Sequence, residues 1–240
     1  MRSSLQGKRA IVTGASSGAG WATVKALAAE GVKVMATARR EERLQALQAE
    51  VSEAGGHCIY SVGDAGASET ASSVVDATME HFGGVDILIN NAGQGNYKSL
   101  IDTSLDEYDE LMQSNMRSSF LFTRAVVPYF MAQRSGVLVF VSSVAGLAGA
   151  ANEAVYSASK FAQVGFAQSL DHELRPHGIK VSTLCPGGMK TEFAVGRGRL
   201  ATDVENSRMM EASDFADSIV FVCMQPANVR LPLLTVRHMG

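Results

Sequence analysis

The stretch from Arg9 to Gly20 reads R-A-I-V-T-G-A-S-S-G-A-G and decides the fold of the chain. Its first five residues form a short β-branched run that ends at a glycine, which is typical of a buried strand. Alanine, valine and leucine then recur through residues 22–28, and this spacing predicts a helix. A strand, a glycine-rich turn and a helix in this order are the context that a dinucleotide-binding loop requires.

The glycines of this loop have distinct predicted roles. Gly14 permits the tight turn, Gly18 lets the backbone approach a pyrophosphate, and Gly20 allows the helix to pack closely. The N-terminus of the helix then faces the anion. The spacing is G-x-x-x-G-x-G rather than G-x-G-x-x-G, so an ordinary glycine-rich turn is the alternative interpretation of this stretch alone.

A second strand, predicted at residues 32–38, ends in Arg39 and Arg40. At this position an acidic side chain would bond the free 2′-hydroxyl of NAD, whereas an arginine suits the 2′-phosphate of NADP. The strand tip carries no Asp or Glu, and Glu41 stands further along. We therefore expect NADP (NADPH) rather than NAD, with the alternative that the two arginines only begin a solvated helix.

The rest of the chain alternates between strand and helix patterns, which is typical of an α/β domain. Further strands are predicted at residues 58–62, 85–90, 136–141, 178–184 and 233–236. Helices are predicted at residues 41–54, 67–82, 105–131 and 214–224, and one more begins near residue 154.

Polar side chains follow three of these strands. Asp64 could accept from the amino group of an adenine or could cap the next helix. Residues 90–93 read N-N-A-G, and the two small residues let a flat ring lie against the backbone at the carboxyl ends of the strands. The hydroxyl of Ser143 can donate to a substrate oxygen, although serines are also common turn residues.

The stretch from Ala154 to Lys160 reads A-V-Y-S-A-S-K and carries the candidate chemistry. In a helix, Tyr156 and Lys160 lie one turn apart on the same face. A free tyrosine has a pKa of roughly 10, and an ammonium within about 4–6 Å lowers it. Such a pair can exchange a proton with an alcohol or carbonyl oxygen. A Tyr and a Lys on an ordinary amphipathic helix is the alternative.

Two residues disfavour a regular helix at residues 105–131. Most mid-helix asparagines face solvent, but at Asn115 we expect a distortion that frees a backbone carbonyl for a water. Pro128 is expected to kink the helix near its end.

The composition describes one globular domain over residues 1–240, with 46% hydrophobic and 19% charged residues. A net charge of −3 argues against nucleic acid as a partner. The chain shows no targeting or membrane-spanning pattern, so we expect a cytoplasmic protein that does not bind a membrane. The three cysteines are far apart and have no metal-ligand spacing, so neither a disulfide framework nor a metal is expected. Polar residues at about 190–214 predict a loop that covers a substrate.

Taken together, the motifs resemble the short-chain dehydrogenase/reductase family over nearly the whole chain. The matching segments are T-G-A-S-S-G-A-G, N-N-A-G, Asn115, Ser143, Y-S-A-S-K and P-G-G-M-K-T, in this order. The resemblance implies a Rossmann-like, doubly wound three-layer sandwich whose seven-stranded parallel sheet has the order 3-2-1-4-5-6-7. Within this family, the chain is similar to NADP-dependent carbonyl reductases and to 3-hydroxy-acid and serine dehydrogenases.

The resemblance also implies roles for individual residues. Tyr156 would be the acid/base, Ser143 would polarise the carbonyl, and Asn115 would hold a water in a proton relay. Lys160 would bond the nicotinamide ribose and lower the pKa of Tyr156. Cofactor contacts are expected from Gly14, Ser16, Ser17, Gly18, Ala19, Arg39, Arg40, Asp64, Ala65, Asn91, Ala92, Gly93, Tyr156, Lys160, Pro186, Gly187, Met189 and Thr191. The substrate pocket is expected to be lined by Gln94, Tyr97, Ala145, Leu147, Asn152 and Gly188, with Lys190 or Arg197 as the candidate clamp for a carboxylate.

Two departures from the family pattern stand out. Ala19 replaces the usual Ile, and the C-terminal residues V-R-L-P-L-L-T-V-R-H-M-G lack the glycine-rich ending of the fatty-acid-synthesis ketoreductases. A homo-oligomer, a tetramer or a dimer, is an expectation from the family alone.

The predicted function is an NAD(P)-dependent oxidoreductase that moves hydride between nicotinamide and a carbonyl or secondary alcohol. The alternative is a catalytically silent NADP-binding regulatory protein. An epimerase or dehydratase would need a longer substrate region than residues 190–214 supply.

Overall fold

The chain folds around one parallel sheet, as described by a computed structural model for residues 3–239. The seven strands have the order β3-β2-β1-β4-β5-β6-β7 and every neighbouring pair is parallel, which confirms the predicted fold. The strands are β1 (Arg9–Thr13), β2 (Lys33–Ala38), β3 (His57–Val62), β4 (Ile87–Asn90), β5 (Gly136–Val141), β6 (Ile179–Pro186) and β7 (Leu233–Val236).

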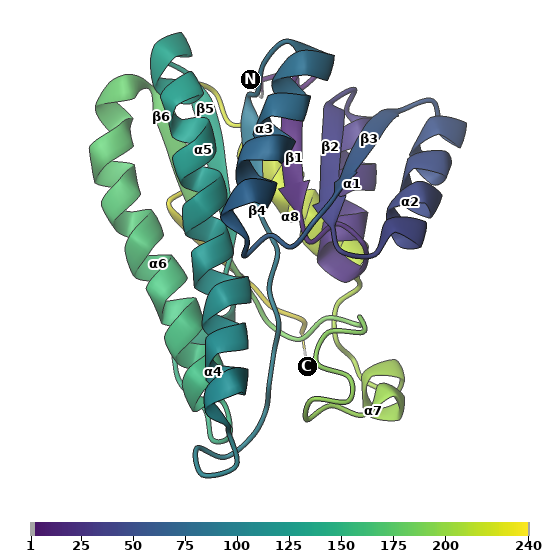
Figure 1. Ribbon diagram of the computed structural model, residues 1–240, viewed down its shortest axis with the longest axis vertical. Helices are drawn as coiled ribbons and strands as arrows, with labels where there is room; N and C mark the ends of the chain where they lie inside the picture. The colour runs from purple at the N-terminus through teal and green to yellow at the C-terminus, as the bar shows by residue number, and fades with distance from the viewer. Residues whose placement is uncertain (1–2, 240) are drawn as a thin grey trace.

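Helices cover both faces of the sheet and make a three-layer sandwich (Figure 1). One face packs against α1 (Gly18–Ala29), α2 (Glu41–Glu53) and α8 (Ala212–Cys223). The other face packs against α3 (Ser68–Phe82), α5 (Ser118–Gln133) and α6 (Ala154–Leu174). Shorter elements complete the chain: α4 (Leu105–Met112), the π-helix η1 (Gln113–Arg117), the 3₁₀ turns η2 (Val144–Gly146) and η3 (Arg175–His177), and α7 (Ala201–Glu205).

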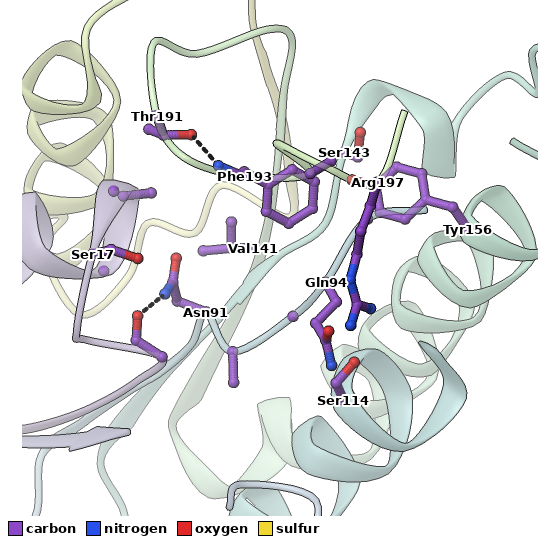
Figure 2. Close-up of a pocket in the computed structure, with 18 of the residues that line it drawn as sticks. Ser17, Asn91, Gln94, Ser114, Val141, Ser143, Tyr156, Thr191, Phe193 and Arg197 are labelled. Carbon is purple, nitrogen blue, oxygen red and sulfur yellow. Dashed lines mark hydrogen bonds between the residues drawn. The ribbon is translucent and has the colours of Figure 1, made fainter. Parts of the chain in front are cut away.

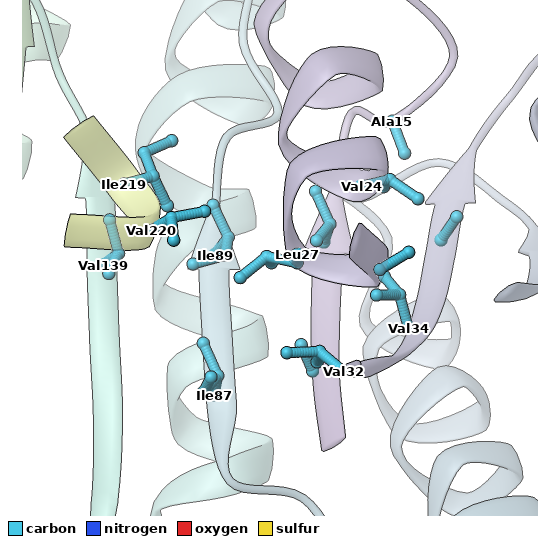
Figure 3. Packing of buried hydrophobic residues seen from close by; sticks show 14 of the residues in the cluster. Ala15, Val24, Leu27, Val32, Val34, Ile87, Ile89, Val139, Ile219 and Val220 are labelled. Atoms are coloured by element: carbon cyan, nitrogen blue, oxygen red, sulfur yellow. The ribbon is translucent and has the colours of Figure 1, made fainter. Parts of the chain in front are cut away.

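Strand β5 shows why the sequence forms this sandwich. All six of its residues, G-V-L-V-F-V, are buried. Side chains alternate between the two faces of a strand, so Val139 packs with α1 and α8, whereas Leu138 and Phe140 pack with α3, α5 and α6. Figure 3 shows Val139 beside Ile219 of α8. Burying each such side chain contributes about 1.5–3 kcal/mol, so a continuous apolar run is stable only between two helical layers.

The helix predicted at residues 105–131 is interrupted where a distortion was expected. Helix α4 begins at a capping box, in which Ser104 and Glu107 bond each other's backbone amides. Asn115 then lies inside the π-helix η1, so the predicted distortion is confirmed. Helix α5 continues past Pro128 to Gln133. A π segment has one extra residue in its turn, which turns the Asn115 carbonyl out of the regular ladder.

The segment between β6 and α8 has little regular structure beyond α7. The segment predicted as a loop at residues 190–214 is therefore mostly irregular, although α8 begins at Ala212, two residues earlier than predicted. That it covers a substrate stays a prediction. Figure 1 shows α7 beyond the lower edge of the sheet. Within residues 3–239, no helix combines the length and apolar character that crossing a bilayer requires.

An ion pair joins the beginning of β1 to the residue before β4. The Arg9 Nε donates to Asp86 Oδ2 at 2.7 Å, and the Arg9 backbone amide donates to the same oxygen at 2.9 Å. Burial raises the pKa of the Asp86 carboxyl, but the hydrogen bonds and charge of Arg9 outweigh it, and the net pKa lies below its ordinary value of 3.8. The folded state therefore favours the ionised carboxylate.

We predict that Asp86→Asn lowers the free energy of unfolding at pH 7 by roughly 1 kcal/mol. Because the folded pKa is depressed, the stabilisation is fully present above pH 3.8 and is lost as the pH falls through the folded value. Urea unfolding at pH 7 and at pH 3 measures the difference. Asp76→Asn on the exposed face of α3 is the control, and an equal loss at both pH values would contradict the assignment.

Candidate functional site

A cavity of about 810 Å³ opens at the carboxyl ends of the strands. Ligands of open parallel sheets bind at this edge. Figure 2 shows Ser17, Asn91 and Thr191 at one end, and Ser143, Tyr156 and Arg197 at the other. The predicted residues that line the cavity are Gly14, Ser16, Ser17, Gly18, Ala19, Arg39, Arg40, Asp64, Ala65, Asn91, Ala92, Gly93, Gln94, Tyr97, Ser143, Ala145, Tyr156, Lys160, Pro186, Gly187, Gly188, Met189 and Thr191.

Three predicted site residues do not line this cavity. Leu147 follows the turn η2 and is partly exposed, and Asn152 precedes α6 with a left-handed backbone (φ 63°). Asn115 is fully buried behind the wall. Of the two cations considered as a carboxylate clamp, Lys190 pairs with Glu211 outside the lining, whereas Arg197 does line the cavity.

The glycine loop forms one end of the cavity, and its shape excludes side chains. Gly14 has φ +66°, and a Cβ there would stand 2.7 Å from the Cα of Ala92. A Cβ on Gly20 would stand 2.3 Å from the Gly14 carbonyl oxygen. The Asn91 amide donates to the carbonyls of Thr13 and Gly14 at 2.9 and 3.1 Å. The loop is therefore a cradle of exposed backbone, as a pyrophosphate needs.

The two arginines after β2 differ in their contacts. Arg40 donates to the Ser16 hydroxyl at 3.0 and 3.1 Å and pairs with Glu192 at 2.5 Å. Its hydrogen bond lowers the pKa of Glu192. Arg39 lines the cavity and forms no ion pair within residues 3–239. Together with the glycine cradle, a guanidinium that forms no ion pair among the described residues fits a dinucleotide that carries a 2′-phosphate.

Asp64 is held by its own loop. Its Oδ1 accepts from the Gly66 amide at 2.9 Å, and Gln113 of η1 lies 3.5 Å from its Oδ2. The residue that caps α3 is Ala67 rather than Asp64, so the helix-cap alternative is wrong. The contact with an adenine amino group stays a prediction.

Tyr156 and Lys160 lie on one face of α6, as the four-residue spacing predicts. The Lys160 Nζ is 5.9 Å from the centre of the Tyr156 ring, and both side chains are buried. Burial raises the pKa of Tyr156, and a hydrogen bond with the Ser143 side chain partly opposes the increase. The net pKa of Tyr156 is therefore raised rather than lowered in this structure, and a lowering effect of Lys160 stays a prediction. The ammonium donates to Val141 and Gln163, and burial lowers its own pKa to about 8.

Asn115 connects the loop after β4 to helix α6. Its Oδ1 accepts from the Gln94 amide at 2.7 Å, and its Nδ2 donates to the Gln94 carbonyl at 3.0 Å and to Ser159 Oγ at 2.8 Å. Its backbone carbonyl, however, accepts from Gln163 at 2.9 Å and from Ser119 at 3.0 Å. The predicted free carbonyl is therefore occupied by side chains, and that expectation was wrong.

The structure adds Phe193, Arg199 and Glu153 to the cavity lining, and the sequence analysis named none of them. Phe193 and the predicted pocket residue Tyr97 pack at 6.0 and 5.7 Å from Tyr156, measured between ring centres. The guanidinium of Arg199 lies 5.1 Å from the centre of the Tyr97 ring. Glu153 precedes α6 and lines the same end, where burial raises its pKa. Phe193 and Arg199 belong to the loop of residues 190–214, where the weak periodicity carried no signal for them.

Arg197 ties this loop to helix α4. Its guanidinium donates to both carboxylate oxygens of Glu110 at 3.0 and 3.1 Å. This bidentate geometry is the stronger form of an Arg–carboxylate pair. Arg197 is therefore paired with a carboxylate of the protein. Arg199 forms no direct ion pair among the described residues, although its charge lowers the pKa of Glu153.

Comparisons with known proteins agree with this geometry. An uncharacterized oxidoreductase of Staphylococcus epidermidis is 31% identical over 230 residues, which is 96% of both chains. A metagenomic short-chain oxidoreductase in complex with NADP is 31% identical with a TM-score of 0.86, over 99% of this chain and 100% of that one. The closed form of a serine dehydrogenase complexed with NADP⁺ is 26% identical with a TM-score of 0.90, over 95% and 94%. The family model of the short chain dehydrogenases matches residues 8–199, and the chain belongs to this family of oxidoreductases.

Proposed function

We propose that the protein is an NADPH-dependent reductase that converts a ketone or aldehyde to an alcohol, with a 3-hydroxy acid as a candidate for the alcohol. The observation that carries the proposal is the convergence of Ser143, Tyr156 and Lys160 on one cavity that also contains the glycine loop. When bound, NADPH supplies the hydride. The glycine loop and Arg39 would hold its phosphates, and Lys160 would bond its nicotinamide ribose.

The side chains at the other end handle the proton. The Ser143 hydroxyl would donate to the carbonyl oxygen and polarise it, and the Tyr156 phenol would deliver the proton. Burial raises the pKa of Tyr156, so the phenol is protonated at neutral pH, which is the form that a proton donor needs.

The substrate end combines apolar walls with two charged groups. Tyr97, Phe193 and Ala145 form the apolar surface around Tyr156. Arg199, above the Tyr97 ring, presents a positive charge that a substrate carboxylate would satisfy. Glu153 lies at the same end, and the charge of Arg199 opposes the increase that burial causes in its pKa. This arrangement favours a substrate with a carboxylate and an apolar chain over a neutral apolar ketone. The loop of residues 190–214 would cover the bound substrate.

A panel of aldehydes, ketones and 3-oxo acids, followed by NADPH absorbance, tests the substrate class. We expect turnover with at least one carbonyl compound, and we expect Arg199→Met to raise the KM of acids more than that of neutral ketones. NADPH binding without turnover of any compound would instead assign the chain as a cofactor-sensing regulatory protein.

We predict that Tyr156→Phe lowers kcat by about 10²–10⁴-fold, because the variant keeps the ring and loses the proton donor. The dissociation constant of NADPH, measured by fluorescence, should change less than about threefold, since the glycine loop and Arg39 are untouched. Tyr129→Phe, on the exposed side of α5, is the matched control and should keep wild-type turnover. Full activity in Tyr156→Phe would end the proposal.

We predict that Arg39→Asp lowers the ratio of kcat/KM for NADPH to that for NADH by roughly ten- to hundredfold. The change removes a charge-assisted contact with the 2′-phosphate and adds an acceptor for a free 2′-hydroxyl. Lys33→Asp makes the same change of charge at the opposite end of β2 and should leave the ratio unchanged. An unchanged ratio in Arg39→Asp would contradict NADP as the preferred cofactor.

We also propose that a second copy of the chain packs on helices α5 and α6 to form a dimer or tetramer. The supporting observation is the set of large apolar side chains that these helices leave exposed, which comprises Phe120, Tyr129, Met131 and Phe161. Large contiguous apolar patches are uncommon on the surface of monomeric proteins, and the proposed interface requires that exposed side chains of the two helices form such a patch.

Light scattering on the purified protein should give a dimer or tetramer, and Phe161→Glu should shift it toward the monomer mass. Leu200→Glu adds the same charge at an exposed apolar residue outside the two helices and serves as the control. A monomeric wild-type protein would reject the proposed assembly.

A further inference from the structure

Behind the cavity, a buried glutamine occupies a position between two groups of the proposed site. The Gln163 Oε1 accepts from the Lys160 ammonium at 3.0 Å, and its Nε2 donates to the Asn115 carbonyl at 2.9 Å and to Ser119 Oγ at 2.8 Å. Gln163 is 0% exposed. Every hydrogen bond of its amide is therefore made inside the protein.

The chemistry of the partners determines the orientation of this amide. An ammonium can only donate and a carbonyl can only accept. The oxygen of Gln163 must therefore face Lys160, and its nitrogen must face Asn115. A water that bridged Lys160 and Asn115 would likewise accept from the first and donate to the second, so the glutamine amide makes the same two bonds as that water.

We propose that the Gln163 side chain, in place of a water, connects Lys160 to the Asn115 carbonyl and is a positioning residue for the Lys160 ammonium. The inference rests on the proposed function, because it assigns Gln163 a task within that site. A water passes a proton onward by giving up one of its own, whereas a neutral amide N–H does not ionise at physiological pH. The connection from Lys160 to η1 through Gln163 therefore does not relay a proton.

Few other groups near Lys160 can stabilise its positive charge. The ammonium has one further acceptor, the Val141 carbonyl at 3.0 Å. Two titratable groups face it: Tyr156 from its own helix, with the ring centre at 5.9 Å, and Cys185 from β6. Burial raises the pKa of both, so both are neutral near pH 7. The Gln163 oxygen is therefore one of only two oxygens among the described residues that bond the buried charge.

Direct titration of Lys160 tests the proposal without relying on turnover. The full-length protein, labelled with ¹³C at the lysine Cε, is titrated by NMR with and without NADP⁺, and the Lys160 signal is assigned from its loss in Lys160→Met. In Gln163→Leu the ammonium loses an acceptor, so its midpoint should move to lower pH by at least about half a unit. In Gln163→Glu the added negative charge should move the midpoint to higher pH.

Ser119→Ala is the matched control, because it removes two hydrogen bonds of the same buried cluster, to the Asn115 carbonyl and from the Gln163 amide, and neither involves Lys160. It should lower the melting temperature as Gln163→Leu does, yet leave the Lys160 midpoint in place. The alkaline limb of the kcat/KM profile should move together with the midpoint in the two Gln163 variants.

An unchanged Lys160 midpoint in Gln163→Leu would overturn the proposal, and, should that variant fail to fold, an unchanged midpoint in Gln163→Glu would do the same. A protein that turns over no carbonyl compound but shows both shifts would refute the proposed function while the link between Gln163 and Lys160 stands.

Discussion

The burial of the Lys160 ammonium is the constraint on which the site depends. A charge removed from water is costly unless hydrogen bonds replace the lost hydration. Lys160 is 3% exposed and forms no ion pair within residues 3–239, so two neutral oxygens, from Val141 and Gln163, hold it. Burial consequently lowers its pKa to about 8. Because only two neutral oxygens stabilise its charge, the Lys160 ammonium can also interact with a ligand that occupies the adjacent cavity.

The scaffold meets this constraint by joining elements that are distant in the sequence. The end of β5 supplies the Val141 carbonyl, the π-helix η1 turns the Asn115 carbonyl toward α6, and Gln163 of α6 closes the connection. Asn115 also fixes the loop after β4 through both of its side-chain atoms. Because each of these groups is buried and fully bonded, the site is positioned before any ligand binds, which is the condition for efficient proton transfer.

Local patterns in the sequence were sufficient for the architecture but not for the electrostatics. The apolar run of β5 and the glycines after β1 act through nearest neighbours, so the strands and the loop could be predicted, and the family resemblance supplied the strand order. The direction of the pKa shift of Tyr156 could not be predicted from local patterns, because burial rather than the neighbouring Lys160 dominates this pKa. Gln163 reads as an ordinary polar residue on a helix, and its bond to Asn115 spans 48 positions. Leu147 and Asn152 were predicted to line the substrate pocket, but they do not line the cavity. Their closeness to Ser143 and Tyr156 in the chain does not determine which wall a turn faces.

A crystal structure of the protein with bound NADPH tests the central claim most directly, namely that Tyr156 delivers a proton where the cofactor delivers a hydride. The account predicts the Tyr156 hydroxyl and the reactive carbon of the nicotinamide ring on the same side of the cavity, close enough for one carbonyl group to reach both. A nicotinamide ring bound elsewhere, or a hydroxyl turned away from it, would contradict the account.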